Sequence, residues 1–130
     1  MRATSDLRGG GVQHILNQMV QYSARLDSAF AAISDPTRRG ILERLGHRPA
    51  SITELAEAFD MTLTGMKKHV QVLEDARLVA TTKVGRVRTC SLGTRQLDAE
   101  AAWIEQLRDM MNARLNRLED FLERTRGDTP

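Results

Sequence analysis

The chain has one cysteine, Cys90, and only 4% aromatic residues among its 130 positions. A single cysteine excludes an internal disulfide bond and a cysteine-based zinc cluster. With so few aromatics, the core must be aliphatic, and a hydrophobic content of 41% is enough to build one. No apolar run approaches the roughly 18 residues that span a membrane, and the N-terminus lacks the apolar stretch of a signal peptide. We therefore expect a cytoplasmic protein with no membrane partner.

Charge is unevenly distributed, although the net charge is only +2. Residues 62–92 hold six Lys/Arg against two acids, whereas residues 93–130 hold six against eight. A basic block of this kind indicates a surface that faces a polyanion. The sequence shows no Ser/His/Asp, Cys/His, paired-carboxylate or glycine-rich phosphate-binding pattern. We therefore expect no enzyme activity, no catalytic residue and no cofactor.

The N-terminal part is expected to divide into a tail and the start of a domain. Residues 1–11 contain three successive glycines, whose backbone entropy opposes a helix, so a flexible tail is predicted there. Residues 12–130 are predicted to form a single domain. Apolar residues at helical spacing predict a first helix between Val12 and Ile33, with a break near Ser23.

Capping signals predict two further helices. Asp35 is a good N-cap, and Pro36 suits the first helical position because its missing N–H has no intrahelical partner there. This helix is expected to end at Gly46. Ser51 and Glu54 form a capping-box pattern that predicts the start of a third helix.

The next helix, from the cap at Thr62 to about Ala76, is strongly two-sided. At 100° per residue its apolar residues gather on one face and its polar residues on the other. The apolar face holds Met66, Val70 and Leu73, and the polar face holds Thr64, Lys67, Lys68, Gln71 and Asp75. Two helices joined by so short a turn have helix–turn–helix geometry, in which the second helix enters the DNA major groove.

A basic β-hairpin is predicted immediately afterwards, in the stretch LVATTKVGRVRTCSL. Gly85 followed by Arg86, between two valines, suits a type II′ turn. Lys83 and Arg88 add two more cations to this short ribbon. A helix–turn–helix followed by such a hairpin is a winged helix, so the predicted fold is mainly α with a small β-hairpin.

The last segment, residues 95–124, is predicted to be one long helix with an apolar residue at every seventh position. At 1.5 Å per residue it would be about 42 Å long, too long to bury its apolar face in so small a domain. A second copy of the chain is the natural partner, which predicts a homodimer with a C-terminal dimerisation helix. The predicted interface residues are Ile15, Leu16, Met19, Leu97, Ile104, Met111, Leu115, Leu118 and Leu122.

The predicted partner of the basic surface is double-stranded DNA. Lysine and arginine can neutralise phosphates or donate to guanine, threonine can contact either, and glycine permits close approach. The predicted DNA-binding residues are Thr62, Thr64, Gly65, Lys67, Lys68, His69, Gln71, Lys83, Arg86 and Arg88. For His69, local packing and hydrogen bonding are an equal alternative. Cys90 is expected to be a small buried residue rather than a redox sensor.

Three stretches together resemble the ArsR/SmtB family of bacterial winged-helix repressors. They are AAISDPTRRGILERL, ITELAEAFDMTLTGMKKHVQVLEDARLV and GRVRTCSL, and the resemblance covers the chain from about Leu26 to its end. It implies a homodimer joined through the first and last helices, bound to a palindromic operator. A winged-helix protein–protein interaction module without DNA binding is the alternative function.

The resemblance also implies metal sensing, and here the sequence departs from the family. SITELAE lacks the expected cysteine pair, and the last helix has neither histidine nor cysteine. Carboxylates alone select poorly for soft or borderline metals, so no metal site is predicted. The inducer stays open between an unknown small organic molecule at the dimer seam, a metal on unexpected ligands, oxidation of Cys90, and none.

Overall fold

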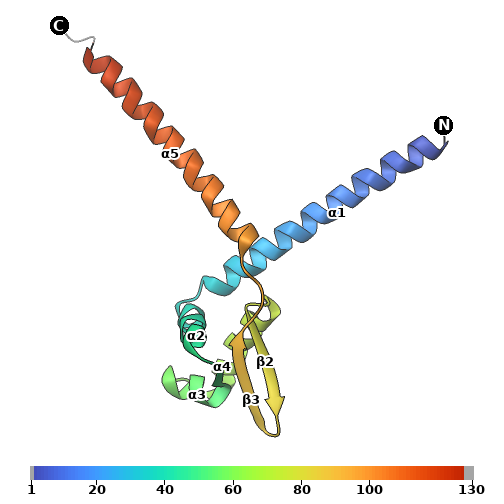
Figure 1. Ribbon diagram of the computed structural model, residues 1–130, viewed down its shortest axis with the longest axis vertical. Coiled ribbons are helices and arrows are strands. Elements are labelled where there is room, and N and C mark those ends of the chain that lie inside the picture. Colours follow the sequence, from blue (N-terminus) through green and yellow to red (C-terminus); the bar gives the residue numbers. More distant parts are fainter. Residues whose placement is uncertain (1, 128–130) are drawn as a thin grey trace. The chain divides into compact units, whose positions relative to one another are not determined.

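The computed structural model describes residues 2–127, with side chains from residue 10 onward. The chain divides between Gln96 and Leu97 into two compact units, and the second holds only the last helix. Figure 1 shows the elements. In chain order they are α1 (Arg2–Ile33), α2 (Pro36–His47), β1 (Ala50–Ser51), α3 (Ile52–Ala58), α4 (Leu63–Asp75), β2 (Val79–Val84), β3 (Val87–Leu92) and α5 (Asp98–Gly127). The predicted mainly helical class with a small hairpin is confirmed.

Helix α1 is longer and more continuous than the sequence predicted. It begins at Arg2 and runs without interruption to Ile33, so residues 2–11 are helical and there is no break near Ser23. The structure thus differs from the flexible tail expected over residues 1–11, of which residue 1 lies outside the described residues. A glycine costs a helix only about 1 kcal/mol, which lowers helix propensity without forbidding the conformation.

The core of the first unit is aliphatic, as predicted. Its largest fully buried side chains come from α2, α3, α4 and β3. These side chains are Ile41, Leu55, Met66, Val70, Leu73 and Cys90. Burying each of them other than Cys90 stabilises the fold by about 1.5–3 kcal/mol.

The three predicted N-caps are all present. The Asp35 carboxylate accepts a hydrogen bond from the Arg38 N–H (3.0 Å). Ser51 Oγ accepts from the Glu54 N–H, and Thr62 Oγ1 accepts from a backbone N–H one turn into α4, both at 3.1 Å. Each cap satisfies a donor that the first helical turn leaves unpaired.

The small sheet has the strand order β1-β3-β2, with antiparallel pairing throughout. Val84 pairs with Val87, and the loop between them holds Gly85 at a φ of 62°. A positive φ at the first loop position is what a type II′ turn requires. Strand β1 was not predicted, because its two residues carry no periodicity of their own and are defined by pairing with β3.

Gly93 lets the end of β3 approach the end of α4 closely. Its N–H donates to Leu78 O at 2.8 Å, and a Cβ at this position would overlap the carbonyl oxygen of Arg77. Because that obstacle is backbone, it cannot rotate away. We expect Gly93→Ala to lower the free energy of unfolding by about 1–3 kcal/mol, as overpacked sites do, measured by urea denaturation.

Gly46 supplies the matched control for this substitution. It lies in α2, and apart from its chain neighbours and the backbone of its own helix, no atom of the described chain comes within 4 Å of the position that its Cβ would occupy. Gly46→Ala should therefore leave stability unchanged or raise it slightly, because alanine favours the helix. Equal stability of the two variants would contradict the close approach at Gly93.

The second unit is helix α5, which begins three residues later than the predicted start at residue 95. Leu97 has a φ of 59°, a left-handed conformation that ends the preceding extended chain before α5 begins at Asp98. Along α5 the apolar side chains are about half exposed, among them Ile104, Met111, Leu115, Leu118 and Leu122. Among residues 2–127, no helix is long and apolar enough to cross a membrane.

Candidate nucleic-acid interface

Helices α3 and α4 form a helix–turn–helix with a short, well-defined turn. The N–H of Met61 donates to Ala56 O at 2.9 Å, which holds the turn against α3. Asp60 adopts a φ of 51°, in the left-handed region that reverses the chain direction after a helix. The cap at Thr62 then starts α4. This geometry fixes where the first turn of α4 lies on the surface.

The two faces of α4 differ as the sequence predicted. Met66, Val70 and Leu73 are at most 2% exposed, so they anchor the helix in the core. Lys67 and Lys68 are exposed. Among the described residues, neither lysine has a hydrogen bond or ion pair. Both ammonium groups are therefore available to an external anion.

The start of α4 offers small polar groups beside these lysines. The side chains of Thr62 and Thr64 are exposed, and Gly65 is partly exposed. A Cβ at Gly65 would lie 3.1 Å from Thr62 Oγ1. The glycine therefore leaves room for the capping hydroxyl of Thr62, and without a side chain it allows another molecule to approach the helix backbone closely.

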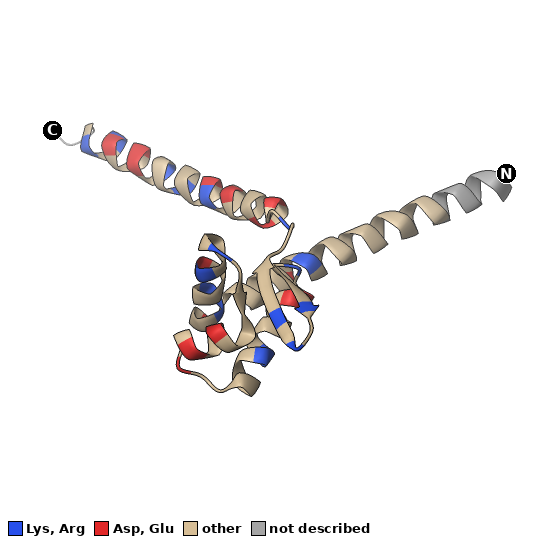
Figure 2. Cartoon of the chain, turned by 60° about the horizontal axis from the view of Figure 1, so that its bottom comes forward, with Lys and Arg blue, Asp and Glu red and all other residues tan. Residues whose placement is uncertain are grey.

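The wing carries the other cations of the predicted set. Lys83, Arg86 and Arg88 are exposed on the hairpin of β2 and β3, whose Lys and Arg segments Figure 2 shows in blue. A groove of about 880 Å³ lies between the start of α3, helix α4 and this hairpin. Its lining brings together Lys67 of α4 and the three wing cations, with Glu54 and Glu74 as the acids.

Glu74 ties the wing to α4, a connection that the sequence did not predict. Its Oε1 accepts from Thr81 Oγ1 at 3.1 Å, and its Oε2 lies 3.8 Å from Arg88 Nη2. Oε2 is buried and has no hydrogen-bond partner in the described structure. Arg88 is thereby held near the groove. The 74–81 and 74–88 separations give no local pattern from which sequence reasoning could have found this pair.

His69 lies in a local network rather than on the open face. Its Nδ1 is 3.3 Å from Arg38 Nη1 and 3.9 Å from Asp35 Oδ2. The Arg38 guanidinium also donates to the carbonyl oxygens of Ala32 (2.7 Å) and Ala31 (3.1 Å) at the end of α1. The backbone hydrogen bond from Arg38, and then the charges of Arg38 and His69, hold the pKa of Asp35 below its ordinary value. The structure contains the local interactions that the sequence left as an alternative for His69.

Gln71 is also engaged within its own helix. Its Nε2 donates to Asp75 Oδ1 at 2.8 Å on the exposed side of α4. While this bond lasts, one of the two amide N–H groups is not available to a base. Gln71 therefore differs from Lys67 and Lys68, which have no such partner among the described residues.

Cys90 is fully buried at the centre of the sheet, where it pairs with Ala50 and Thr81. Burial raises the pKa of its thiol above its ordinary value, although the charge of Arg88 opposes this. The nucleophile in alkylation is the thiolate, so both burial and the raised pKa disfavour reaction. This environment is typical of a structural cysteine.

We expect iodoacetamide at pH 8 to alkylate Cys90 at least about 100-fold more slowly in the native protein than in denaturant. Mass spectrometry of quenched samples measures the alkylation rate, and equal rates in both states would show an accessible, reactive thiol.

The raised pKa of Cys90 also makes the stability of the fold depend on pH. The thiol's contribution to stability is complete below the unfolded-state pKa, and it is lost as the pH rises through the folded-state pKa.

The described residues contain no group of three or more His, Cys, Asp or Glu side chains that could hold a metal ion.

A family model for a helix-turn-helix domain matches residues 33–82, which run from the end of α1 into β2. The HTH-type transcriptional regulator Rv2034 of Mycobacterium tuberculosis (strain ATCC 25618 / H37Rv) is 34% identical over 86 residues, 62% of this chain and 80% of that protein. The crystal structure of the ArsR family transcriptional regulator RHA00566 matches at 40% identity with a TM-score of 0.64, covering 69% of this chain and 93% of that one.

The chain belongs to the ArsR/SmtB family of winged helix-turn-helix transcriptional regulators. A further relative of this ArsR-type chain is the transcriptional repressor SdpR of Bacillus subtilis (strain 168), 30% identical over 79 residues, 61% of this chain and 88% of SdpR. As an ArsR-family member the chain is a DNA-binding regulator of transcription and not an enzyme. The resemblance seen in the sequence is confirmed.

Proposed function

We propose that this ArsR-family regulator is a homodimeric repressor that binds a pseudo-palindromic operator. The observation that carries the proposal is the pairing of exposed, unpartnered lysines on α4 with three cations on the adjacent wing. A helix presented in this way suits the major groove, and a basic ribbon beside it suits the neighbouring backbone. The name of the related repressor SdpR supports repression rather than activation.

The first half of α4 would supply the contacts in the major groove. Lys67 and Lys68 would neutralise phosphates or donate to guanine O6 and N7. Thr62 and Thr64 would contact phosphates or thymine methyl groups, with Gly65 beside them allowing close approach. The buried opposite face fixes the helix rigidly, so these contacts would need little rearrangement.

The wing would contact the backbone beside the major groove. Arg86 lies at the hairpin tip, flanked by Lys83 and Arg88 on the two strands. Glu74 would orient Arg88 and keep the wing close to α4. His69 and Gln71 complete the proposed DNA-binding set, and each already has a local partner in the structure.

The homodimer is supported by the apolar faces that α1 and α5 leave exposed. Ile15, Leu16 and Met19 are between 49% and 62% exposed on α1. Five apolar residues of α5 lie within about 60° of one another around the helix at 100° per residue. They are Ile104, Met111, Leu115, Leu118 and Leu122. Leu97, just before α5, belongs to the same proposed interface. A second copy would cover these faces and place two α4 helices on one DNA, about one helical turn apart.

A gel shift with the purified protein and its own upstream DNA tests the proposal. The duplex should be bound in preference to a scrambled duplex of equal composition. Because phosphate contacts release counterions, binding should weaken steeply between two salt concentrations. Binding that ignores both sequence and salt would sink the proposal, and absence of binding to either duplex would favour the alternative, a winged-helix protein–protein interaction module without DNA binding.

A further inference from the structure

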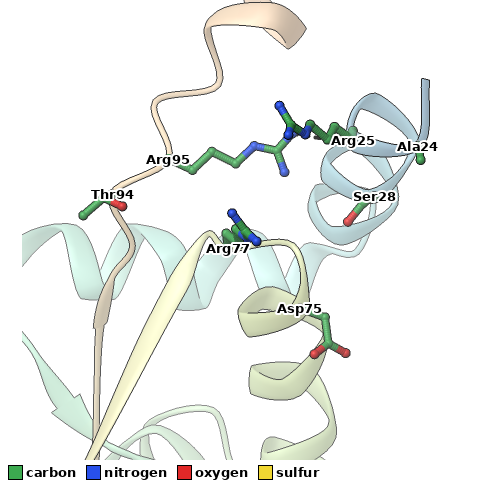
Figure 3. Close-up of a pocket in the computed structure, with 7 residues that line it drawn as sticks. All are labelled: Ala24, Arg25, Ser28, Asp75, Arg77, Thr94 and Arg95. Atoms are coloured by element: carbon green, nitrogen blue, oxygen red, sulfur yellow. Dashed lines mark hydrogen bonds between the residues drawn. The ribbon is translucent and has the colours of Figure 1, made fainter. Parts of the chain in front are cut away.

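A second cavity, outside the DNA-facing groove, lies at the C-terminal end of α4. Its volume is about 460 Å³, and Figure 3 shows its lining. All of the lining residues belong to the first unit, residues 1–96. Three arginines meet there from distant parts of the sequence: Arg25 of α1, Arg77 after α4 and Arg95 after β3.

The cations of this cavity outnumber its acids three to one. Asp75 is the only acid in the lining, and its Oδ1 already accepts a hydrogen bond from Gln71 (2.8 Å). Within the described part of the chain, the guanidinium groups of Arg25 and Arg77 have no hydrogen bond or ion pair. The guanidinium groups of Arg25 and Arg77 therefore repel one another, and an anion between them removes that cost.

The backbone at Arg77 is held in an unfavourable conformation. Its φ is 62°, in the left-handed region that glycine adopts most readily after a helix. The chain is further constrained because Gly93 packs directly against the Arg77 carbonyl group. Figure 3 shows the Arg77 side chain directed toward Arg25 and Arg95. The Arg77 side chain therefore stands in the cavity at a position where glycine would fit the backbone more readily.

We propose that this cavity binds a small anion with two or more carboxylate or phosphate oxygens, as the effector of the regulator. Arg25 and Arg77 supply planar guanidinium groups suited to paired hydrogen bonds with such oxygens. The hydroxyl groups of Ser28 and Thr94, in the same lining, are further donors. The site therefore selects for anionic charge spread over several oxygens.

Arg95 connects this site to the DNA-contacting helix. Its Nη1 donates to the carbonyl oxygen of Ala76, the C-cap of α4, at 2.9 Å, and its Nη2 donates to Arg25 O at 3.0 Å. An anion that draws this guanidinium away removes one link between the end of α4 and α1. Its negative charge also reduces the overall positive potential that attracts DNA, so the anion weakens DNA binding. This coupling rests on the proposed repressor function, whereas binding of the anion does not.

Calorimetric titration of the full chain without DNA tests the site. Citrate and inorganic phosphate serve as probes at constant ionic strength, and at least one should bind saturably with one site per chain. Arg77→Gly should weaken that binding at least about tenfold, because it removes a charge-assisted hydrogen bond. The same variant should raise the thermal midpoint of the anion-free protein by a few degrees, because glycine relieves the left-handed backbone.

Two control variants distinguish loss of the Arg77 side chain from a general loss of positive charge and from relief of a left-handed backbone. Arg48→Gln removes an exposed cation outside the cavity, and Asp60→Gly relieves a left-handed residue (φ 51°) elsewhere. Both should keep the full affinity for the anion. Absence of saturable binding to either probe, or an equal loss in Arg48→Gln and Arg77→Gly, would overturn the site.

DNA binding is then measured by gel shift with and without the bound probe. The anion should weaken operator binding by the wild type and leave binding by Arg77→Gly unchanged. An anion-free Arg77→Gly variant that binds DNA more weakly, with a shallower salt dependence, would show that the cavity contacts a DNA phosphate instead, which overturns the effector assignment. Loss of DNA binding by every variant, with anion binding intact, would contradict the repressor function alone.

Discussion

Replacing Lys67 and Lys68 together by alanine is expected to weaken operator binding by at least about 100-fold at fixed salt. Each lysine would lose a charge-assisted contact of about 1.5–3 kcal/mol to phosphate or guanine. The fold should persist, because both side chains are exposed and alanine favours helix. Fluorescence anisotropy with a labelled operator gives the affinity, and thermal unfolding checks the fold.

Salt dependence distinguishes lost phosphate contacts from a general change in charge. The slope of log affinity against log salt should fall by about 2 if both lysines neutralise phosphates, at about 0.9 for each contact. Arg124→Ala with Arg126→Ala removes the same charge from the last turn of α5 and should leave the affinity and the slope nearly unchanged. Equal losses in both double variants would contradict the assignment of α4 as the DNA-reading helix.

Much of the proposed DNA-binding region was predictable because its signals are local. An N-cap needs a residue and the N–H groups one turn away, so Asp35, Ser51 and Thr62 could each be identified from short stretches. The buried face of α4 follows from the 3.6-residue period alone. The hairpin turn follows from Gly85, whose positive φ the structure shows.

The features that the sequence did not predict depend on contacts between distant residues. Strand β1 exists only through its pairing with β3. Glu74 meets Arg88, and Arg38 meets His69, across separations that no periodic pattern links. Each of these pairs joins two elements that position the proposed site.

The wrong expectation about α1 has a different origin. The three glycines lower helix propensity, but their cost is a sum of small terms that an adjacent helix can offset by continuing. The part of α1 that the sequence did predict as helix is the part with exposed apolar residues, because those from Val12 to Tyr22 are between 48% and 68% exposed. An exposed apolar face of this length indicates a surface that another chain covers.

Leu115→Glu should therefore convert the proposed dimer largely to monomer, raising the dimer dissociation constant at least about 100-fold. Leu115 is 58% exposed in the single chain and lies on the apolar face of α5, near the midpoint of the helix. In a dimer its side chain would be buried, and an unpaired carboxylate there costs several kcal/mol. Sedimentation equilibrium gives the dissociation constant directly.

Ala113→Glu is the matched control, because residue 113 lies about 160° around the helix from residue 115 at 100° per residue. It adds the same charge to the opposite face and should leave the dimer intact. Operator affinity should fall with the dimer in Leu115→Glu, since a monomer engages one half-site and loses the gain from joined binding. A monomeric variant that still bound the full operator tightly would separate DNA recognition from dimerisation, and a dimer unaffected by Leu115→Glu would place the interface elsewhere.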